Sequence, residues 1–480
     1  MYKHTKIVAT LGPASSEEKM LEQLIEAGVS VFRLNFSHGD HADKAALIER
    51  IRRVSSRAGR AIAILGDLQG PKIRVGLLKD GGITLTPGEE VIVTSREVLG
   101  ETGVIPTIYK NLPQDVKAGN QILLDDGLME LEVLETLATD VRCRVRFGGF
   151  LKDRKGINLP GAAVSAPSLT EKDLLDLQFC IDQQVDYLAL SFVRKAADVV
   201  DLKQRLKVAG STIKVISKIE KPEAVDNFDA ILEVTDGVMV ARGDLGVEIR
   251  PEKVPLIQKN IIHKCNLAGK PVITATQMLE SMISNPRPTR AETSDVANAI
   301  LDGTDAVMLS AETAAGQYPV EAVRLMSKVA NDISSASISR GRPHRLTCQN
   351  CEGALDLSEA IGQTASRISE MVGAKAILAF TKSGSTAALV AKYRPSIPII
   401  AVTPSAVVSR QLALYSGVQS LEVDVQGTTE SQIEWVAKAV LDAGALQTGD
   451  IVVITMGSPV SGSGSTNLLK VHQLGDVLQE

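Results

Sequence analysis

Charged and polar residues gather directly after several short apolar runs of the sequence. They occur in the segments RLNFSH at 33–38, DLQGPKIR at 67–74, SKIE at 217–220, RGD at 242–244, TQ at 276–277 and SAE at 310–312. One such segment on its own is consistent with a surface charge or a structural ion pair. Six of them in corresponding positions indicate a shared site, because packing alone gives no reason to place ionised groups in this way.

Four of these segments carry groups suited to binding a metal ion and a phosphate. Lys218 and Glu220 are two positions apart, so on an extended strand they point to the same side. Glu220 and Asp244 follow neighbouring strands and offer two carboxylates, which suit Mg²⁺ better than zinc. Arg33, Arg74 and Lys218 supply positive charge for a phosphate. The pattern predicts a metal-dependent phosphoryl-transfer site.

Repeated βα units are expected to position these segments. Short β-branched runs alternate with longer amphipathic runs, which is typical of a parallel sheet. Strands are predicted at 6–11, 29–34, 61–66, 187–192, 213–217, 237–241, 272–276 and 306–309, and helices at 17–27, 171–183, 222–234, 253–267 and 320–333. Eight such units predict a closed (β/α)₈ TIM barrel, whose active site lies at the carboxyl ends of its strands.

About 100 residues, 71–167, separate the third predicted strand from its helix. They contain alternating stretches at 90–94 and 129–134 and a hairpin signal at Asp126-Gly127. We interpret this segment as a small inserted β domain, a β-barrel. Because this domain is inserted in a βα loop, it is expected to lie over the barrel mouth as a lid that excludes water.

A polar stretch from 335 to about 353 predicts a linker to a separate α/β domain. Strands at 376–380, 399–402, 419–423 and 451–455 alternate with helical patterns, which predicts an open, doubly wound sheet. Two loops rich in Ser and Gly follow strands of this sheet, at 457–466 and at Thr381-Lys382-Ser383-Gly384-Ser385-Thr386. Backbone amides and hydroxyls of such loops bind phosphate, although a single loop of this kind is usually only a connection.

Composition excludes several other classes of protein. A net charge of −5 with 3% aromatic residues gives no footprint for nucleic acid, and no apolar run is long enough to span a membrane, so we expect a cytoplasmic protein. The five cysteines, Cys143, Cys180, Cys265, Cys348 and Cys351, form no disulfide framework, and one Cys-x-x-Cys pair is insufficient for a zinc site. P-loop and GxGxxG motifs are absent from the sequence.

Four motifs resemble the signature segments of the pyruvate kinase family. They are KVISKIE at 214–220, MVARGDLG at 239–246, TATQMLESM at 274–282 and RPTRAE at 287–292. Their length and order make the resemblance specific, and it extends over nearly the whole chain. It implies a glycolytic enzyme that converts phosphoenolpyruvate, ADP and a proton into pyruvate and ATP. It also implies a catalytic barrel at 1–70 and 168–340, a lid at 71–167 and an effector domain at 354–480, assembled as a homotetramer.

The resemblance also implies roles for individual residues. Lys218 would stabilise the phosphoryl group in transfer, and Glu220 and Asp244 would hold Mg²⁺. Arg33 would bind the substrate phosphate and Thr276 would position the proton donor. The substrate-binding set is Arg33, Lys218, Gly243, Asp244 and Thr276, with the amides of Gly243 and Asp244 on the carboxylate. The nucleotide-binding set is Asn35, Ser37, His38, Arg74 and Lys155, and the effector loop is Thr381 to Thr386.

A monovalent cation site is the one departure from the family pattern. The family ligands for K⁺ are matched by Asn35, Ser37, Asp67 and Leu68, but Lys72 stands where K⁺-dependent members carry a Glu. The ammonium of Lys72 could supply the charge that K⁺ brings. We therefore hypothesise that K⁺ dependence is reduced or absent.

Two other functions fit part of the sequence. A metal-dependent aldolase or lyase acting on an enolate would keep the carboxylates, but it would have no use for Arg74, Lys155 and the lid. A catalytically silent sensor would keep only the C-terminal phosphate loops, which leaves Lys218, Glu220, Asp244 and Thr276 unexplained. The sequence does not identify the effector, the cooperativity, the preferred nucleotide or a role for Cys348 and Cys351.

Overall fold

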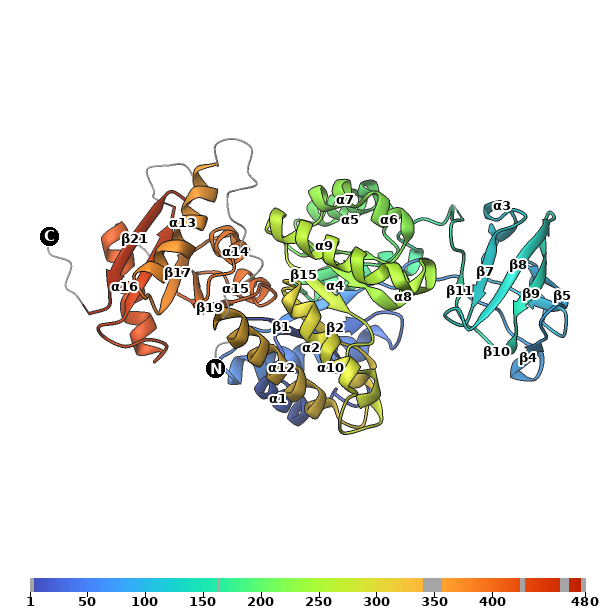
Figure 1. The fold of residues 1–480 in the computed structure, drawn as a ribbon, viewed down its shortest axis with the longest axis horizontal. Coiled ribbons are helices and arrows are strands. Elements are labelled where there is room, and N and C mark those ends of the chain that lie inside the picture. Colours follow the sequence, from blue (N-terminus) through green and yellow to red (C-terminus); the bar gives the residue numbers. More distant parts are fainter. Residues whose placement is uncertain (1–3, 163, 340–355, 424–427, 458–465, 476–480) are drawn as a thin grey trace.

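The computed structural model describes residues 4–162, 164–339, 356–423, 428–457 and 466–475. Three parts lie in a row along the long axis of the molecule: the C-terminal domain, the barrel in the centre and the inserted β domain (Figure 1). In the described residues, no helix is long and apolar enough to cross a membrane.

The central part is a closed barrel of eight parallel strands in the order β1-β16-β15-β14-β13-β12-β3-β2. The strands are β1 (Lys6–Thr10), β2 (Val31–Asn35), β3 (Ala63–Asp67), β12 (Tyr187–Leu190), β13 (Lys214–Ile219), β14 (Gly237–Ala241), β15 (Val272–Ala275) and β16 (Ala306–Leu309). They are short apolar runs buried on both faces, as a parallel sheet covered by helices requires. The predicted barrel is confirmed.

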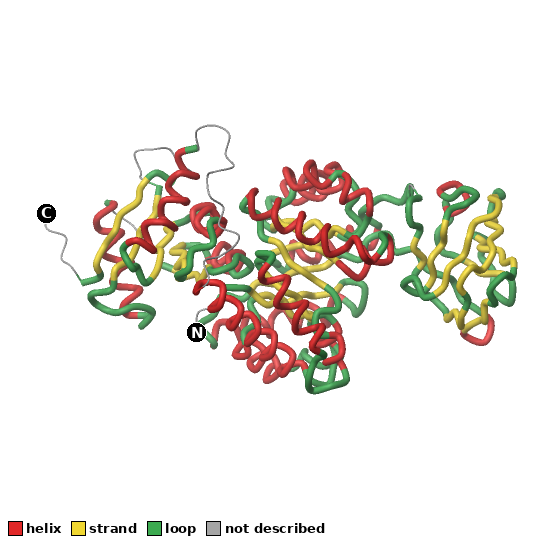
Figure 2. The backbone as a smooth tube through the Cα atoms, viewed as in Figure 1, coloured by secondary structure: helices red, strands yellow, loops and turns green. Residues whose placement is uncertain are grey.

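Helices surround the barrel strands as a ring (Figure 2). They are α1 (Glu18–Ala27), α2 (His41–Arg57), α4 (Glu171–Asp182), α5 (Ala196–Val208), α6 (Pro222–Asp226), α7 (Phe228–Val234), α8 (Arg242–Glu248), α9 (Val254–Ala268), α10 (Arg290–Leu301), α11 (Ala311–Ala314) and α12 (Pro319–Ser339), with short 3₁₀ turns η2 (Pro251–Lys253) and η3 (Glu280–Ile283). Capping boxes at Thr170 and Thr289 fix the starts of α4 and α10. The single helix predicted at 222–234 is wrong, because the chain leaves helical geometry at Asn227.

The inserted domain packs its strands around one apolar core. Its strands are β4 (Gly82–Leu85), β5 (Glu90–Thr94), β6 (Val104–Pro106), β7 (Gln121–Leu124), β8 (Met129–Thr136), β9 (Asp140–Phe147), β10 (Gly149–Lys152) and β11 (Ile157–Asn158), with η1 (Lys79–Gly81) and α3 (Leu112–Asp115). They pair as a six-stranded sheet and a separate two-stranded sheet, β10-β4, rather than as one closed ladder. Positive φ angles at Asp126 and Gly127 make the predicted hairpin turn.

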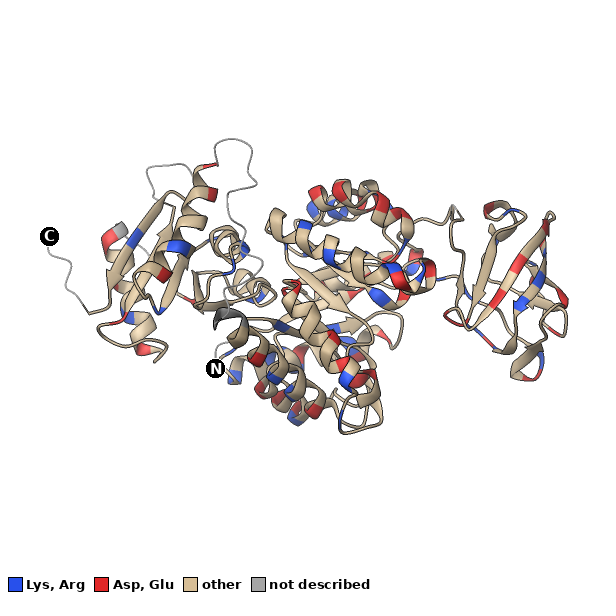
Figure 3. Cartoon of the chain, viewed as in Figure 1, with Lys and Arg blue, Asp and Glu red and all other residues tan. Residues whose placement is uncertain are grey.

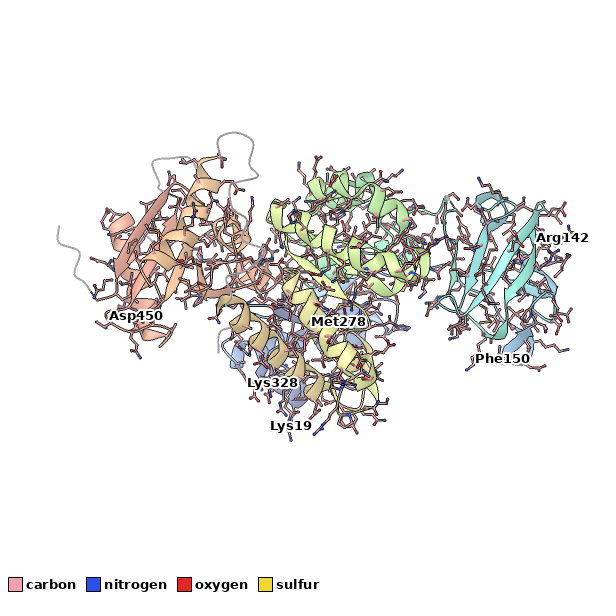
Figure 4. The ribbon with its side chains drawn as sticks, viewed as in Figure 1. Lys19, Arg142, Phe150, Met278, Lys328 and Asp450 are labelled. Carbon is pink, nitrogen blue, oxygen red and sulfur yellow. The ribbon has the colours of Figure 1, made fainter. Side chains whose placement is uncertain are left out.

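The outer surface of the inserted domain is charged on both neighbouring strands β8 and β9 (Figure 3). Arg146 of β9 pairs with Glu132 of β8 at 2.7 Å, a cross-strand pair exposed to solvent. Arg142 projects from the side of this domain that is farthest from the barrel, and Phe150 lies at its lower edge in this view (Figure 4). The surface that turns toward the barrel is therefore the one relevant to the site.

The C-terminal domain is a five-stranded sheet in the order β19-β18-β17-β20-β21. Its elements are β17 (Ala376–Phe380), β18 (Ile399–Thr403), β19 (Val418–Glu422), β20 (Ile451–Met456), β21 (Leu468–Gln473), α13 (Leu357–Met371), α14 (Ser385–Lys392), α15 (Ala406–Leu412) and α16 (Thr429–Asp442). The four predicted strands are parallel, and the unpredicted β21 adds an antiparallel edge. The predicted linker starts too early, since α12 continues to Ser339; Cys348 and Cys351 lie outside the described residues.

The C-terminal domain closes the base of the barrel, at the amino ends of the strands. Arg394 pairs with Asp305 at 2.6 Å, and Arg410 with Asp186 at 2.7 Å, both aspartates preceding barrel strands. Ala413 and Leu414 belong to the same buried cluster as the side chains inside the barrel. The base is therefore sealed, and the mouth at the opposite end is left for chemistry.

Candidate active site

Lys218 is the centre of a charged cluster at the barrel mouth. Its Nζ lies 2.7 Å from Glu220 Oε1 and 3.3 Å from Asp67 Oδ1, and it donates a hydrogen bond of 2.8 Å to Ser191 Oγ. Strand β13 places Lys218 and Glu220 on one side, and Asp67 ends β3. Only 11% of the Lys218 side chain is exposed, and the three carboxylates Asp67, Glu220 and Asp244 outweigh the effect of burial and raise its pKa. The ammonium is held charged.

Arg33 binds the opposite side of Asp67. Its Nε lies 2.6 Å from Asp67 Oδ2, and its Nη1 donates to Thr10 Oγ1 at 3.1 Å. Burial favours the neutral form of Asp67, but Lys218 and Arg33 outweigh it, so the pKa of this carboxyl lies below its usual range. Two cations therefore stand side by side around one ionised aspartate.

Glu220 and Asp244 form an acidic pair beside Lys218. Glu220 Oε2 accepts the Phe192 amide hydrogen at 2.9 Å, which fixes the carboxylate. Burial raises the pKa of Glu220, the charge of Asp244 raises it further, and Lys218 opposes both. A divalent cation would relieve this repulsion, and two carboxylates are a usual protein contribution to a Mg²⁺ site. The donor set therefore fits Mg²⁺, and no cluster of three or more acidic, His or Cys side chains competes with it in the described residues.

Thr276 is held in a strained conformation beside Gly243. Its φ is +70°, and that of Gln277 is +54°, in the left-handed region that such residues rarely adopt. Arg242 Nη2 donates to the Thr276 carbonyl at 2.8 Å, and the guanidinium also pairs with Asp295 at 2.6 Å. The Gly243 amide donates to Thr276 Oγ1 at 3.2 Å; a Cβ at Gly243 would lie 3.0 Å from Thr276 Cγ2, so glycine permits this approach.

The predicted nucleotide-binding residues come from two domains. Arg74 and Lys155 lie on the inserted domain, where Arg74 Nη1 donates to the Arg154 carbonyl at 3.1 Å and Lys155 pairs with Asp125 at 2.8 Å. His38 is exposed in the loop after β2. The structure thus places these three at the rim and on the lid rather than in the Lys218 cluster.

The residues predicted for a monovalent cation meet at the ends of β2 and β3. Asn35 is in register with Asp67, and Asn35 Oδ1 accepts the Ser37 amide hydrogen at 3.0 Å. The Leu68 carbonyl accepts a hydrogen bond from Ser191 Oγ at 2.7 Å. Lys72 lines a cleft between barrel and inserted domain, which also contains Asp244.

The predicted effector loop connects β17 to α14. Its turn is closed by the Gly384 amide, which donates to Thr381 Oγ1 at 2.8 Å, and Ser383 Oγ donates to Ser385 Oγ at 3.1 Å. Thr386 Oγ1 lies 3.0 Å from Thr466 Oγ1, which ties this loop to the second predicted loop. Most of that second loop, 458–465, lies outside the described residues.

Ser191 and Thr10 contact the cluster but are not singled out by the sequence pattern, and Arg242, which lies in the RGD segment, has no role predicted from it. Ser191 accepts the Lys218 hydrogen bond, Thr10 accepts one from Arg33, and Arg242 clamps Thr276. Ser191 and Thr10 were placed inside predicted strands. The signal that could have found them is position, because each lies at the carboxyl end of a barrel strand.

Comparisons with known proteins agree with this geometry. Residues 2–323 match the pyruvate kinase barrel domain, and residues 359–472 match the pyruvate kinase alpha/beta domain. The chain is 50% identical to a pyruvate kinase of Geobacillus stearothermophilus, over 100% of this chain and 81% of that protein. A pyruvate kinase of Staphylococcus epidermidis is 48% identical over 99% of this chain and 81% of its own.

A solved structure is also similar. The crystal structure of a pyruvate kinase from Cryptosporidium parvum superposes with a TM-score of 0.91, at 38% identity, over 98% of this chain and 96% of that one. These matches decide against the aldolase or lyase interpretation and confirm an enzyme. The chain belongs to the pyruvate kinase family.

Proposed function

We propose that the cluster around Lys218 is where this phosphotransferase moves a phosphoryl group from phosphoenolpyruvate to ADP, with uptake of a proton, to give pyruvate and ATP. The observation that carries the proposal is one buried ammonium lying within 3.3 Å of carboxylates from two strands. Phosphoryl transfer depends on positioning and on charge stabilisation, so a site rich in fixed charge and without a nucleophile suits it.

Lys218 and Arg33 are proposed to bind the phosphoryl group. Both are mostly buried, at 11% and 12% side-chain exposure, so their charge acts through little water. Asp67 lies between them and keeps them apart in a fixed orientation. The cations are therefore arranged before the substrate arrives.

Glu220 and Asp244 are proposed to hold Mg²⁺. When bound, this ion supplies positive charge that neutralises phosphate and carboxylate oxygens. The protein's own contribution is the fixed orientation of Glu220, which the Phe192 amide holds. No third carboxylate is required, since substrate oxygens and water complete such a site.

Thr276 is proposed to position the proton donor for the enolate, through water. The Arg242 clamp keeps its hydroxyl against the Gly243 amide. The Gly243 and Asp244 amides at the start of α8 are proposed to bind the substrate carboxylate. Proton delivery and substrate orientation would then depend on the same turn.

Arg74, Lys155, His38, Asn35 and Ser37 are proposed to bind the nucleotide. Because the first two lie on the inserted domain, they reach the barrel mouth only if that domain covers it. The lid would then exclude water from the reacting phosphoryl group.

Lys72 is proposed to reduce or remove the requirement for K⁺ at the site of Asn35, Ser37, Asp67 and Leu68. Its position at the junction of barrel and inserted domain supports an ammonium near the nucleotide. Initial rates with and without K⁺, in tetramethylammonium buffers, test this; strong activation by K⁺ would contradict it.

The loop Thr381-Lys382-Ser383-Gly384-Ser385-Thr386 is proposed to bind a phosphorylated metabolite that activates the enzyme, and the chain is proposed to act as a cytoplasmic homotetramer. The hydroxyls at the start of α14 support the first point. A panel of sugar phosphates and nucleotides, scored by substrate affinity, tests it. Unchanged affinity throughout would argue against it.

Replacement of Lys218 tests the whole assignment. Lys218→Met removes the ammonium but keeps much of the side-chain volume, so we expect pyruvate formation to fall at least about 10³-fold. A coupled assay with phosphoenolpyruvate and ADP measures this, and circular dichroism checks the fold. Lys259→Met, which removes a lysine 55% exposed, is the matched control. Near-normal turnover of Lys218→Met would refute the assignment.

A further inference from the structure

Glu248 is a buried carboxylate beside the mouth to which none of the proposed roles applies. It is the last residue of α8, and its side chain is 1% exposed. Its Oε1 accepts hydrogen bonds from two donors, Lys221 Nζ at 2.5 Å and Asn158 Nδ2 at 2.8 Å. Asn158 belongs to β11 of the inserted domain, and Lys221 to the loop after β13. One oxygen therefore joins the two domains.

Lys221 follows Glu220 directly in the chain. Its ammonium lies 5.5 Å from the centroid of the Phe192 ring, and the Phe192 amide is the donor that fixes Glu220. Lys221 and Asp244 line the same cleft between the barrel and the inserted domain. An ammonium released from Glu248 would be an unpaired cation in the cleft that Asp244 also lines.

A released ammonium would compete with a divalent cation. Both are attracted by the carboxylates of Glu220 and Asp244, and their mutual repulsion is strong where water is scarce. The pairing with Glu248 prevents this competition, because a buried carboxylate left without its cation is strongly destabilising. The arrangement thus keeps a lysine beside the acidic pair without neutralising that pair.

We infer that Glu248 is a positioning residue that holds the Lys221 ammonium away from Glu220 and Asp244 and, through the same oxygen, attaches the inserted domain by Asn158. The charge of the metal site and the attachment of the lid then depend on one carboxylate. This inference rests on the proposed magnesium site.

The first experiment tests whether Glu248 keeps the Lys221 ammonium away from Glu220 and Asp244. It measures the binding of Mn²⁺ to the whole chain by electron paramagnetic resonance, without substrates. Glu248→Gln keeps an acceptor for Asn158 but removes the negative charge that holds Lys221, so we expect Mn²⁺ to bind roughly tenfold more weakly. In Glu248→Gln/Lys221→Met the competing ammonium is gone, and the affinity is expected within about twofold of wild type. Circular dichroism checks folding. If Glu248→Gln alone does not fold, the double variant, which leaves no unpaired charge, carries the test.

Limited proteolysis tests whether the hydrogen bond from Asn158 to Glu248 attaches the inserted domain to the barrel. Asn158→Leu removes the donor but leaves the pair of Lys221 and Glu248, so cleavage within 159–166 should accelerate while Mn²⁺ affinity stays unchanged. Asp302→Asn is the matched control, since it removes a carboxylate that pairs with Lys259 on the outside of the barrel. Neither measurement should change in this control.

The outcomes separate this inference from the proposed function. Wild-type affinity in Glu248→Gln, or a double variant that binds as weakly as the single one, would overturn the inference alone. Cleavage of Asn158→Leu at the wild-type rate would overturn the role of Glu248 in attaching the lid. Absence of Mn²⁺ binding by the wild-type chain would overturn both the inference and the proposed magnesium site.

Discussion

At the base of the barrel, Asp186 accepts hydrogen bonds from Arg52, Arg410 and the Ile64 amide, whereas at the mouth Asp67 shares the ammonium of Lys218 with Glu220. Both aspartates are buried beside two cations. At the base, each carboxylate oxygen has its own donors.

The mouth differs because its carboxylates outnumber its cations, whereas at the base one aspartate faces two arginines. Three carboxylates, Asp67, Glu220 and Asp244, lie around two cations, Arg33 and Lys218. Burial raises the pKa of Glu220; the charge of Lys218 opposes this rise, and the charge of Asp244 adds to it. A buried ion pair is thus no sign of function by itself; a surplus of charge that only a ligand can balance is the better sign.

The largest effect at the base is expected from Asp305→Ala. Asp305 accepts hydrogen bonds from both terminal nitrogens of Arg394, at 2.6 and 2.9 Å, and from the Ser416 amide at 3.0 Å. Loss of one partner of a buried pair costs about 3–5 kcal/mol. Denaturant unfolding measures this, with the exposed pair of Asp201 and Arg205 as control, where Asp201→Ala should change little. If Asp305→Ala and Asp201→Ala lower the free energy of unfolding equally, the contacts of Asp305 at the base do not stabilise the fold more than an exposed ion pair does.

A smaller loss is expected from Leu414→Ala. Leu414 is 1% exposed and packs in the cluster inside the barrel, so the truncation leaves a cavity and costs about 2–4 kcal/mol of stability. The matched variant is Leu256→Ala, at a position 72% exposed. If the two variants unfold at the same denaturant concentration, Leu414 does not seal the barrel.

The smallest effect is expected from pH. The folded-state pKa of Asp67 is lowered, so its stabilisation is present above the unfolded pKa and is lost as the pH falls through the folded value, below about 4. The pKa of Glu220 is raised, so acid first removes a destabilising charge there. Unfolding free energies of wild type, Asp67→Asn and Glu220→Gln against pH should show these opposite slopes. An unchanged acid limb in Asp67→Asn would contradict the first.

Much of the barrel and its site could be predicted from the sequence because local pattern determines them. Buried strands read as short apolar runs, and the spacing of Lys218 and Glu220 places both on one side of β13. Asp67 ends β3 and Asp244 closely follows β14. Their place at the mouth follows from the general rule that the active site of such a barrel lies at the carboxyl ends of its strands.

Other features could not be predicted, because they depend on contacts distant in sequence. The helix break at Asn227 has no Gly or Pro beside it to signal it. Strand β21 forms only because it pairs, antiparallel, with β20. The roles of Arg242, Ser191 and Glu248 depend on which strands and loops become neighbours. Pairing of the inserted strands in two sheets likewise depends on packing around one core.

Leu414 and Ala413 complete the apolar filling of a barrel to which they do not belong in sequence. A fragment ending before the C-terminal domain would carry all eight strands. It would leave the apolar side chains at the amino ends of those strands exposed to solvent. Work that produces the catalytic part separately should therefore retain the 410–418 segment, which carries Leu414.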